Sequence, residues 1–89
     1  MPDEARGTFA VADRDGLHAR PCARIAKTAA KFKKCAVTLH FDGRSAKATS
    51  VFELLGLVAA GGAVIEVRAV GKDAAACVAA IGAQLANGD

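Results

Sequence analysis

A histidine and an arginine two residues apart carry the most reactive chemistry in this sequence. His18 and Arg20 lie in the segment GLHARPC, which runs from Gly16 to Cys22. Imidazole is a nucleophile near neutral pH, and a guanidinium group binds phosphate oxygens through a fixed fork of N–H donors. This pair could therefore accept a phosphoryl group and stabilise its negative charge.

The residues after His18 predict that a helix begins directly behind it. Apolar residues from Ala19 to about Phe32 recur at the spacing of one helical face, and Pro21 suits the first turn, where a missing N–H costs no hydrogen bond. His18 is then the N-cap, a position that Ser, Thr, Asp or Asn fills better. The free N–H groups and the positive dipole end favour an anion and a neutral imidazole there. The alternative is that His18 and Arg20 are ordinary polar residues at a loop–helix junction.

The elements that must position this histidine follow from hydrophobic periodicity. Alternating apolar residues predict four strands, a 3.6-residue period predicts three helices, and Asp42-Gly43 is typical of a two-residue hairpin turn. The order β-α-β-β-α-β-α favours an α+β open-faced sandwich, a four-stranded antiparallel sheet with three helices on one face. The predicted strands are Thr8–Ala12, Cys35–Phe41, Arg44–Thr49 and Ala63–Val70, and the predicted helices are Ala19 to Phe32, Ser50 to Leu57, and a last one that Asp73 caps.

Length and composition restrict the class of protein. Eighty-nine residues suffice for one small domain, 1–89, and 53% of them are hydrophobic. No apolar run is long enough to cross a membrane, and the polar N-terminus differs from a signal peptide, so we expect a cytoplasmic protein, in its simplest form a monomer. A net charge of +3, without an aromatic platform, argues against nucleic acid as a partner.

The cysteines argue against a disulfide framework and against a metal site. Cys22, Cys35 and Cys77 are an odd number, have no C-x-x-C spacing and lie in apolar stretches, which predicts buried free thiols. His18 and Cys22 are spaced as half a metal site, but no second pair of ligands has suitable spacing. We expect no metal and no cofactor.

Three features together resemble the HPr family, the histidine-containing phosphocarrier proteins of the bacterial phosphotransferase system. They are the string GLHARP, the short helix SVFELLGL that Ser50 opens, and the order of elements, and they span about Thr8 to Leu85. The resemblance implies that His18 accepts phosphate on Nδ1 from phosphorylated enzyme I and passes it to IIA domains, for sugar uptake or regulation. Arg20 would support the transferring group, and the chain would be a carrier within a relay rather than an independent enzyme. The alternative is a regulatory interaction module, of the nitrogen-type branch or of metabolic control, that acts by protein binding.

A basic stripe on the first helix predicts where partner proteins bind. Its four residues recur at helical spacing and end at the reactive histidine, so a one-sign surface would raise encounter rates with acidic partners. The alternative is an ordinary solvated helix face. We define the basic stripe as Arg20, Arg24, Lys27 and Lys31.

The short second helix predicts an apolar contact beside the stripe. Leu54 and Leu57 should face the core, whereas Val51, Phe52 and Leu55 cannot all do so. Exposed apolar residues on a small domain often mark a partner site, and in the family this helix joins the docking surface. We expect Phe52 to be the exposed anchor, with Val51 and Leu55 beside it.

Ser50 raises a second, regulatory question. The resemblance implies that an HPr kinase/phosphorylase could phosphorylate Ser50, but Ser50 and Glu53 also form a capping-box pattern in which the serine is only an N-cap. Regulated members often have Gly where this chain has Glu53, and a carboxylate there would repel a phosphate. The remaining histidine, His40, alternates with Thr38 and is expected at the surface.

Overall fold

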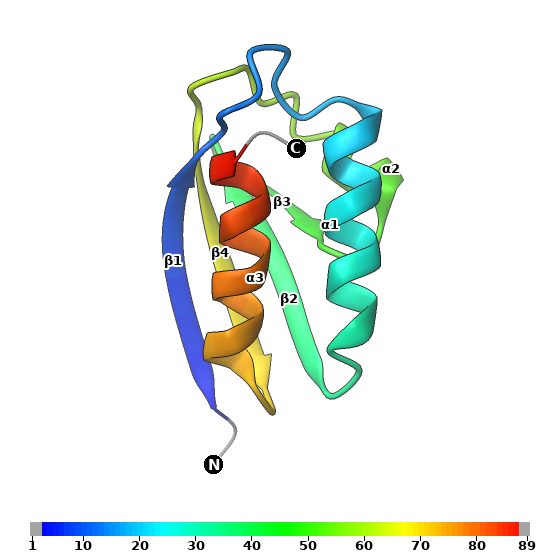
Figure 1. The fold of residues 1–89 in the computed structure, drawn as a ribbon, viewed down its shortest axis with the longest axis vertical. Helices are drawn as coiled ribbons and strands as arrows, with labels where there is room; N and C mark the ends of the chain where they lie inside the picture. The colour runs from blue at the N-terminus through cyan, green and yellow to red at the C-terminus, as the bar shows by residue number, and fades with distance from the viewer. Residues whose placement is uncertain (1–2, 88–89) are drawn as a thin grey trace.

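The structure, a computed structural model, describes residues 3–87, which form four strands and three helices in the predicted order. The strands make one antiparallel sheet in the order β1-β4-β2-β3. The helices α1 and α3 lie side by side over one face, and α2 packs beside α1 and β3 (Figure 1). The bounds are β1 Glu4–Ala10, α1 Ala19–Lys31, β2 Cys35–Phe41, β3 Arg44–Lys47, α2 Val51–Leu55, β4 Val64–Gly71 and α3 Ala74–Asn87.

The core fills the space between the sheet and the two long helices. Leu39 and Ile65 from the sheet, and Ile25 and Ile81 from the helices, have no exposed surface. In β4 the predicted alternation is confirmed, because Ile65, Val67 and Ala69 are buried while Glu66 and Arg68 form an ion pair on the other face. No polar or charged side chain is fully buried within residues 3–87, so apolar packing holds the layers together.

The first strand was the poorest of the sequence predictions. Periodicity locates it at Thr8–Ala12, but β1 begins at Glu4 and ends at Ala10, paired with β4 from Glu4↔Val70 to Ala10↔Val64. Before Phe9, the residues on the inward side of β1 are Ala5 and Gly7. Their side chains are too small to produce a recognisable alternation of apolar and polar residues. A Cβ at Gly7 would lie 2.9 Å from the Phe9 ring, so the small residue makes room for the aromatic one.

The end of the third strand also differs from the prediction, whereas the start of the last helix agrees with it. The strand predicted to reach Thr49 ends at Lys47, because the chain turns there toward the start of α2. Asp73 precedes α3 as expected, with a left-handed backbone of φ 65°, and its carbonyl accepts the N–H of Cys77 at 2.9 Å.

The prediction of three buried thiols is wrong for one cysteine. All three are free, but only Cys22 and Cys77 are buried, whereas Cys35 is partly exposed because it opens β2 just after an exposed turn. Burial raises the pKa of Cys22 to about 11 and that of Cys77 to about 11, the latter with a contribution from the neighbouring Cys35. The two buried thiols therefore stay protonated and unreactive near neutral pH.

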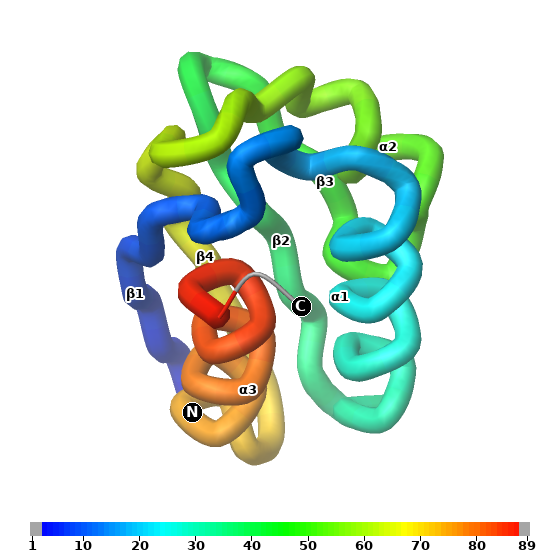
Figure 2. The backbone as a smooth tube through the Cα atoms, turned by 45° about the horizontal axis from the view of Figure 1, so that its top comes forward, coloured from blue at the N-terminus to red at the C-terminus, as the bar shows by residue number. Residues whose placement is uncertain are grey.

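Two loops meet at the end of the molecule where α1 begins. Figure 2 shows the loop from β1 to α1 running beside the segment 56–63. Leu17 N–H donates to the Ala59 carbonyl at 2.9 Å, and Val11 N–H donates to the Ala63 carbonyl at 2.8 Å. Gly16, with φ 74°, lies so close to Ala59 that a side chain would collide with its carbonyl. The segment that leads into α1 is thus held by backbone contacts from far along the chain.

No helix within residues 3–87 is both long enough and apolar enough to span a membrane.

Candidate functional site

His18 is the N-cap of α1, as the sequence predicts. Its backbone is extended, with φ −87° and ψ −175°, and its carbonyl accepts the N–H of Cys22 at 3.2 Å. The ring Nδ1 accepts the backbone N–H of Arg20 at 3.4 Å, which is long for a hydrogen bond. One ring nitrogen therefore faces the first turn of the helix, where N–H groups without helical partners collect.

The other ring nitrogen contacts an aspartate that the sequence analysis did not single out. His18 Nε2 lies 2.9 Å from Asp13 Oδ2, and Asp13 Oδ1 accepts the backbone N–H of Asp15 at 2.9 Å. The pKa of Asp13 is lowered below its ordinary value of 3.8. The hydrogen bond from the Asp15 N–H makes the largest contribution, and the hydrogen bond with His18 makes the next. A lowered carboxyl pKa stabilises the fold above about pH 4, and this contribution is lost as the pH falls through the lowered value.

The available signal for Asp13 was the spacing Asp-x-Asp-Gly before Leu17. An aspartate at the start of such a turn bonds the backbone N–H two residues on, which bends the chain back on itself. Here the Gly16 N–H also donates to the Asp13 carbonyl at 2.9 Å. The turn brings Asp13 to His18 across five positions of sequence.

Arg20 is exposed in the first turn of α1, two residues from the cap. Its positive charge reaches the same loop, since it contributes to the lowered pKa of Asp13. No acidic residue occupies the first turn of α1. The positive charge of Arg20 and the positive end of the helix dipole together make the first turn of α1 favourable for an anion.

Within residues 3–87, Asp13, Asp15 and His18 form a group whose residue types could bind a metal ion. Their potential ligand atoms lie within 4.8 Å of one another. A cation bound there would compete with the Asp13 hydrogen bond for Nε2. Cys22 does not join this group, because it is buried and its S–H donates to the Leu17 carbonyl at 3.7 Å.

At the start of α2, one of the two hydrogen bonds of the predicted capping box is present and the other is not. Ser50 Oγ accepts the Glu53 N–H at 3.1 Å, as expected of an N-cap. Glu53 Oε1, however, accepts the N–H of Lys47 at 3.0 Å instead of the Ser50 N–H, which donates to the Lys47 carbonyl. The reciprocal contact is absent because the turn from β3 already satisfies the Ser50 N–H. Glu53 therefore ties α2 to the end of β3.

The apolar side chains around α2 divide as the sequence predicts. Leu54 and Leu57 are buried, Val51 is half-buried, and Phe52 is 86% exposed with Leu55 at 39%. The structure adds Val58, which the sequence analysis missed and which is 71% exposed. Val58 has φ 53°, a left-handed conformation that is unusual for a β-branched residue. We define the apolar patch as Phe52, Leu55 and Val58.

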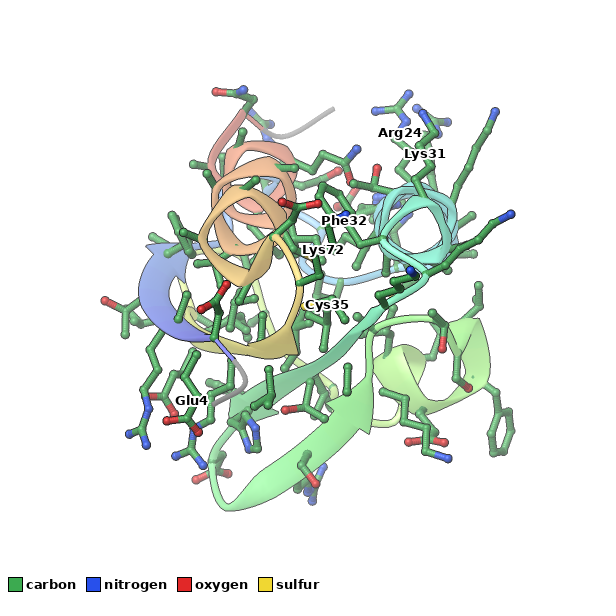
Figure 3. All side chains as sticks on the ribbon, turned by 90° about the horizontal axis from the view of Figure 1, so that it is seen from below. Glu4, Arg24, Lys31, Phe32, Cys35 and Lys72 are labelled. Atoms are coloured by element: carbon green, nitrogen blue, oxygen red, sulfur yellow. The ribbon has the colours of Figure 1, made fainter. Side chains whose placement is uncertain are left out.

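The basic stripe follows α1 away from His18. Arg20, Lys27 and Lys31 are exposed and Arg24 is half-buried. Figure 3 shows Arg24 and Lys31 on the side of α1 that points away from the sheet, whereas Phe32 lies between α1 and α3. The helix that carries the stripe, α1, is in contact with α2.

His40 is separate from this site. It lies in β2 and is half-buried, not fully at the surface, and its Nε2 forms a hydrogen bond with Thr38 Oγ1 at 2.8 Å.

Comparison with known proteins gives a consistent result. Residues 5–87 match the family model described as the PTS HPr component phosphorylation site. The phosphocarrier protein HPr of Xylella fastidiosa is 40% identical over 63 residues, which cover 71% of this chain and 70% of that protein. The crystal structure of HPr from Bacillus anthracis superimposes with a TM-score of 0.86 at 26% identity, over 92% of this chain and 96% of that one. A histidine-containing phosphocarrier protein from Mycoplasma gives 0.83 at 29% identity, over 90% of each chain.

Proposed function

Since this chain belongs to the HPr phosphocarrier family of the phosphotransferase system, we propose that His18 accepts a phosphoryl group from a donor protein and passes it to an acceptor protein. The observation that carries the proposal is the position of His18 Nδ1, 3.4 Å from the Arg20 N–H at the positive end of α1. A nucleophile at a helix N-terminus gives the transferred phosphate backbone donors and a favourable dipole.

Arg20 supplies the charge in this proposal. Phosphoryl transfer needs positioning and stabilisation of negative charge more than covalent help from the protein. Arg20 is exposed and two residues from His18, so its guanidinium can reach the oxygens of a phosphoryl group held between two proteins. The protein acts as a carrier in a relay and needs no cofactor.

The partners in the proposal are phosphorylated enzyme I as donor and IIA domains as acceptors. The basic stripe, with Arg24 and Lys27 at its centre, and the apolar patch, with Val51 at its margin, form the docking surface. Mixed surfaces of this kind combine fast electrostatic encounter with a few anchoring contacts. We place the protein in the cytoplasm as a monomeric carrier of one domain.

The test uses the chain with phosphoenolpyruvate and enzyme I. We expect a mass gain of one phosphoryl group that is stable in base, labile in acid and lost in His18→Ala. His40→Ala is the matched control, because it removes the other histidine and should leave the gain intact. A gain that persists in His18→Ala would refute the site, and no gain in the wild-type chain would favour a module that acts only by binding.

A further inference from the structure

We propose that Asp13 is a positioning residue that holds the His18 ring in the tautomer with its proton on Nε2, so that Nδ1 presents its lone pair to the incoming phosphoryl group. This inference rests on the proposed function and adds to it a residue that fixes the tautomer of the His18 ring. It starts from the 2.9 Å contact between Asp13 Oδ2 and His18 Nε2.

Two contacts select the same tautomer. An ionised carboxylate can only accept hydrogen bonds, so the nitrogen that faces Asp13 must carry the proton. The backbone N–H of Arg20 can only donate, so the nitrogen that faces it must carry the lone pair. In the neutral ring, Nε2 is therefore the donor and Nδ1 the acceptor, and the opposite tautomer would lose both contacts.

Asp13 is itself held in place on the side away from the ring. Its Oδ1 accepts the Asp15 N–H at 2.9 Å and its carbonyl accepts the Gly16 N–H at 2.9 Å. A side chain at position 61 would come within 2.7 Å of the Asp13 carbonyl, so Gly61 allows the loops to pack this closely. With Oδ1 occupied by the turn, Oδ2 is the oxygen that remains for Nε2.

The transfer step then needs no proton to leave the ring. The Nδ1 lone pair forms the new bond to phosphorus while the bond from phosphorus to the donor atom breaks, and that electron pair leaves with the donor. The proton stays on Nε2, so the phosphorylated ring carries a positive charge that faces the Asp13 carboxylate. The phosphoryl oxygens replace Nδ1 as acceptors for the first-turn N–H groups. The pairing of His with Asp recurs in enzymes for the same reason, to fix the tautomer and stabilise the cation.

Asp13→Asn provides the sharpest test, because it should reverse the tautomer. The amide oxygen can keep the bond to the Asp15 N–H, which leaves the NH₂ group facing Nε2 as a donor. Nε2 should then accept and Nδ1 should carry the proton, since the 3.4 Å contact from the Arg20 N–H is the weaker of the two contacts to the ring. We expect ¹⁵N chemical shifts of the His18 ring, recorded at about pH 8.5 where free imidazole is neutral, to show protonated Nε2 in the wild-type chain and protonated Nδ1 in Asp13→Asn.

Phosphoryl transfer from enzyme I should be slower in Asp13→Asn, because the reversed tautomer has a proton on Nδ1. The corresponding Asp→Asn change in a serine protease lowers kcat about 10⁴-fold, and we expect a smaller loss here, about 10- to 100-fold, because this ring is partly exposed to solvent. Asp13→Ala, which offers neither donor nor acceptor, should give a mixture of tautomers and an intermediate rate. This second variant preserves the test if Asp13→Asn folds poorly.

Asp15→Asn is the matched control. It removes the same charge within 4.8 Å of the ring, but Asp15 contacts Asp13 through its backbone N–H, which the substitution keeps. Its tautomer and its rate should match the wild type. If Asp13→Asn keeps the proton on Nε2, or reverses the tautomer without slowing transfer, the proposal is overturned. A wild-type chain that accepts no phosphate refutes the proposed function instead, and the ring shifts still decide whether Asp13 sets the tautomer.

Discussion

The helices α1 and α2 begin in different ways. α2 begins at Ser50, whose hydroxyl accepts a first-turn N–H at 3.1 Å, and an acidic residue, Glu53, lies in its first turn. α1 begins at His18, whose ring accepts a first-turn N–H at 3.4 Å, and its first turn has no acidic residue. The Ser50 cap serves stability, whereas the His18 cap leaves the positive helix end available to an anion.

The acidic residues near the two caps also differ in what they contact. Glu53 binds the Lys47 N–H and so connects α2 to β3. Asp13 binds the imidazole of His18 from a loop that precedes α1. An acidic group inside the first turn of α1 would neutralise the site that a phosphate needs, but Asp13 lies on the opposite side of the ring. The Ser50 cap therefore serves folding and the His18 cap serves chemistry, and four variants test this difference and the docking surface around it.

Giving α1 the cap of α2 should have the largest effect. His18→Ser replaces a long cap contact by a better acceptor but also removes the contact with Asp13, so we expect the free energy of unfolding to change by less than about 0.5 kcal/mol while phosphoryl acceptance disappears. Thermal unfolding and the enzyme I assay measure the two effects. The comparison of the caps fails if the variant is clearly less stable than the wild type, and the site assignment fails if it still accepts phosphate.

Reversing charge in the basic stripe should slow transfer without removing the site. For Arg24→Glu combined with Lys27→Glu we expect about tenfold slower transfer from enzyme I at low salt, with a weaker dependence on salt. The matched control is Lys33→Glu with Lys34→Glu, which changes the net charge equally in the turn after α1, far from His18 along the helix. Equal slowing in both double variants would mean that net charge, and not the stripe, determines the rate.

Removing the exposed ring of α2 should weaken binding but not folding. Because Phe52 is 86% exposed, Phe52→Ala should change the free energy of unfolding by less than about 0.5 kcal/mol. Its loss as an anchor should weaken affinity for the acceptor protein by about tenfold in titration calorimetry. Val64→Ala, at an exposed valine in β4, is the control and should leave affinity unchanged. Unaltered affinity in Phe52→Ala would remove the apolar patch from the docking surface.

Removing the Ser50 cap of α2 should have the smallest effect on phosphoryl transfer. Ser50→Ala removes the acceptor for the Glu53 N–H, so we expect a loss of about 1 kcal/mol in the free energy of unfolding. The rate of phosphoryl transfer at His18 should stay within about twofold of the wild type, since the substitution leaves the first turn of α1 intact. A large fall in rate with unchanged stability would assign Ser50 to the transfer site.

The sequence predicted those parts of the site that depend on spacing along one element. The positions of His18 at a helix start and of Phe52 outside the core follow from periodicity, because each depends only on which side of its own helix the residue occupies. The central strands β2 and β4 were predicted within a residue for the same reason. The start of β1 was hidden, since Ala5 and Gly7 on its inward side give no hydrophobic alternation.

The sequence could not predict contacts between residues that a turn of the chain brings together. Asp13 reaches His18 only because the turn at Asp15 and Gly16 folds back, and Glu53 reaches Lys47 only because β3 ends early. Val58, three residues after the end of α2, combines a left-handed backbone with an exposed side chain. Such contacts depend on loop conformation, which propensity and periodicity describe poorly. They include the contact of Asp13, which we propose fixes the tautomer of His18.

The most direct test of the central claim is the location of the phosphoryl group on the phosphorylated protein. With histidine labelled by ¹⁵N and phosphate transferred from enzyme I, we predict a one-bond ¹⁵N–³¹P coupling to Nδ1 of His18, with the proton still on Nε2. Phosphorus coupled to Nε2 of His18, or to either nitrogen of His40, would contradict it.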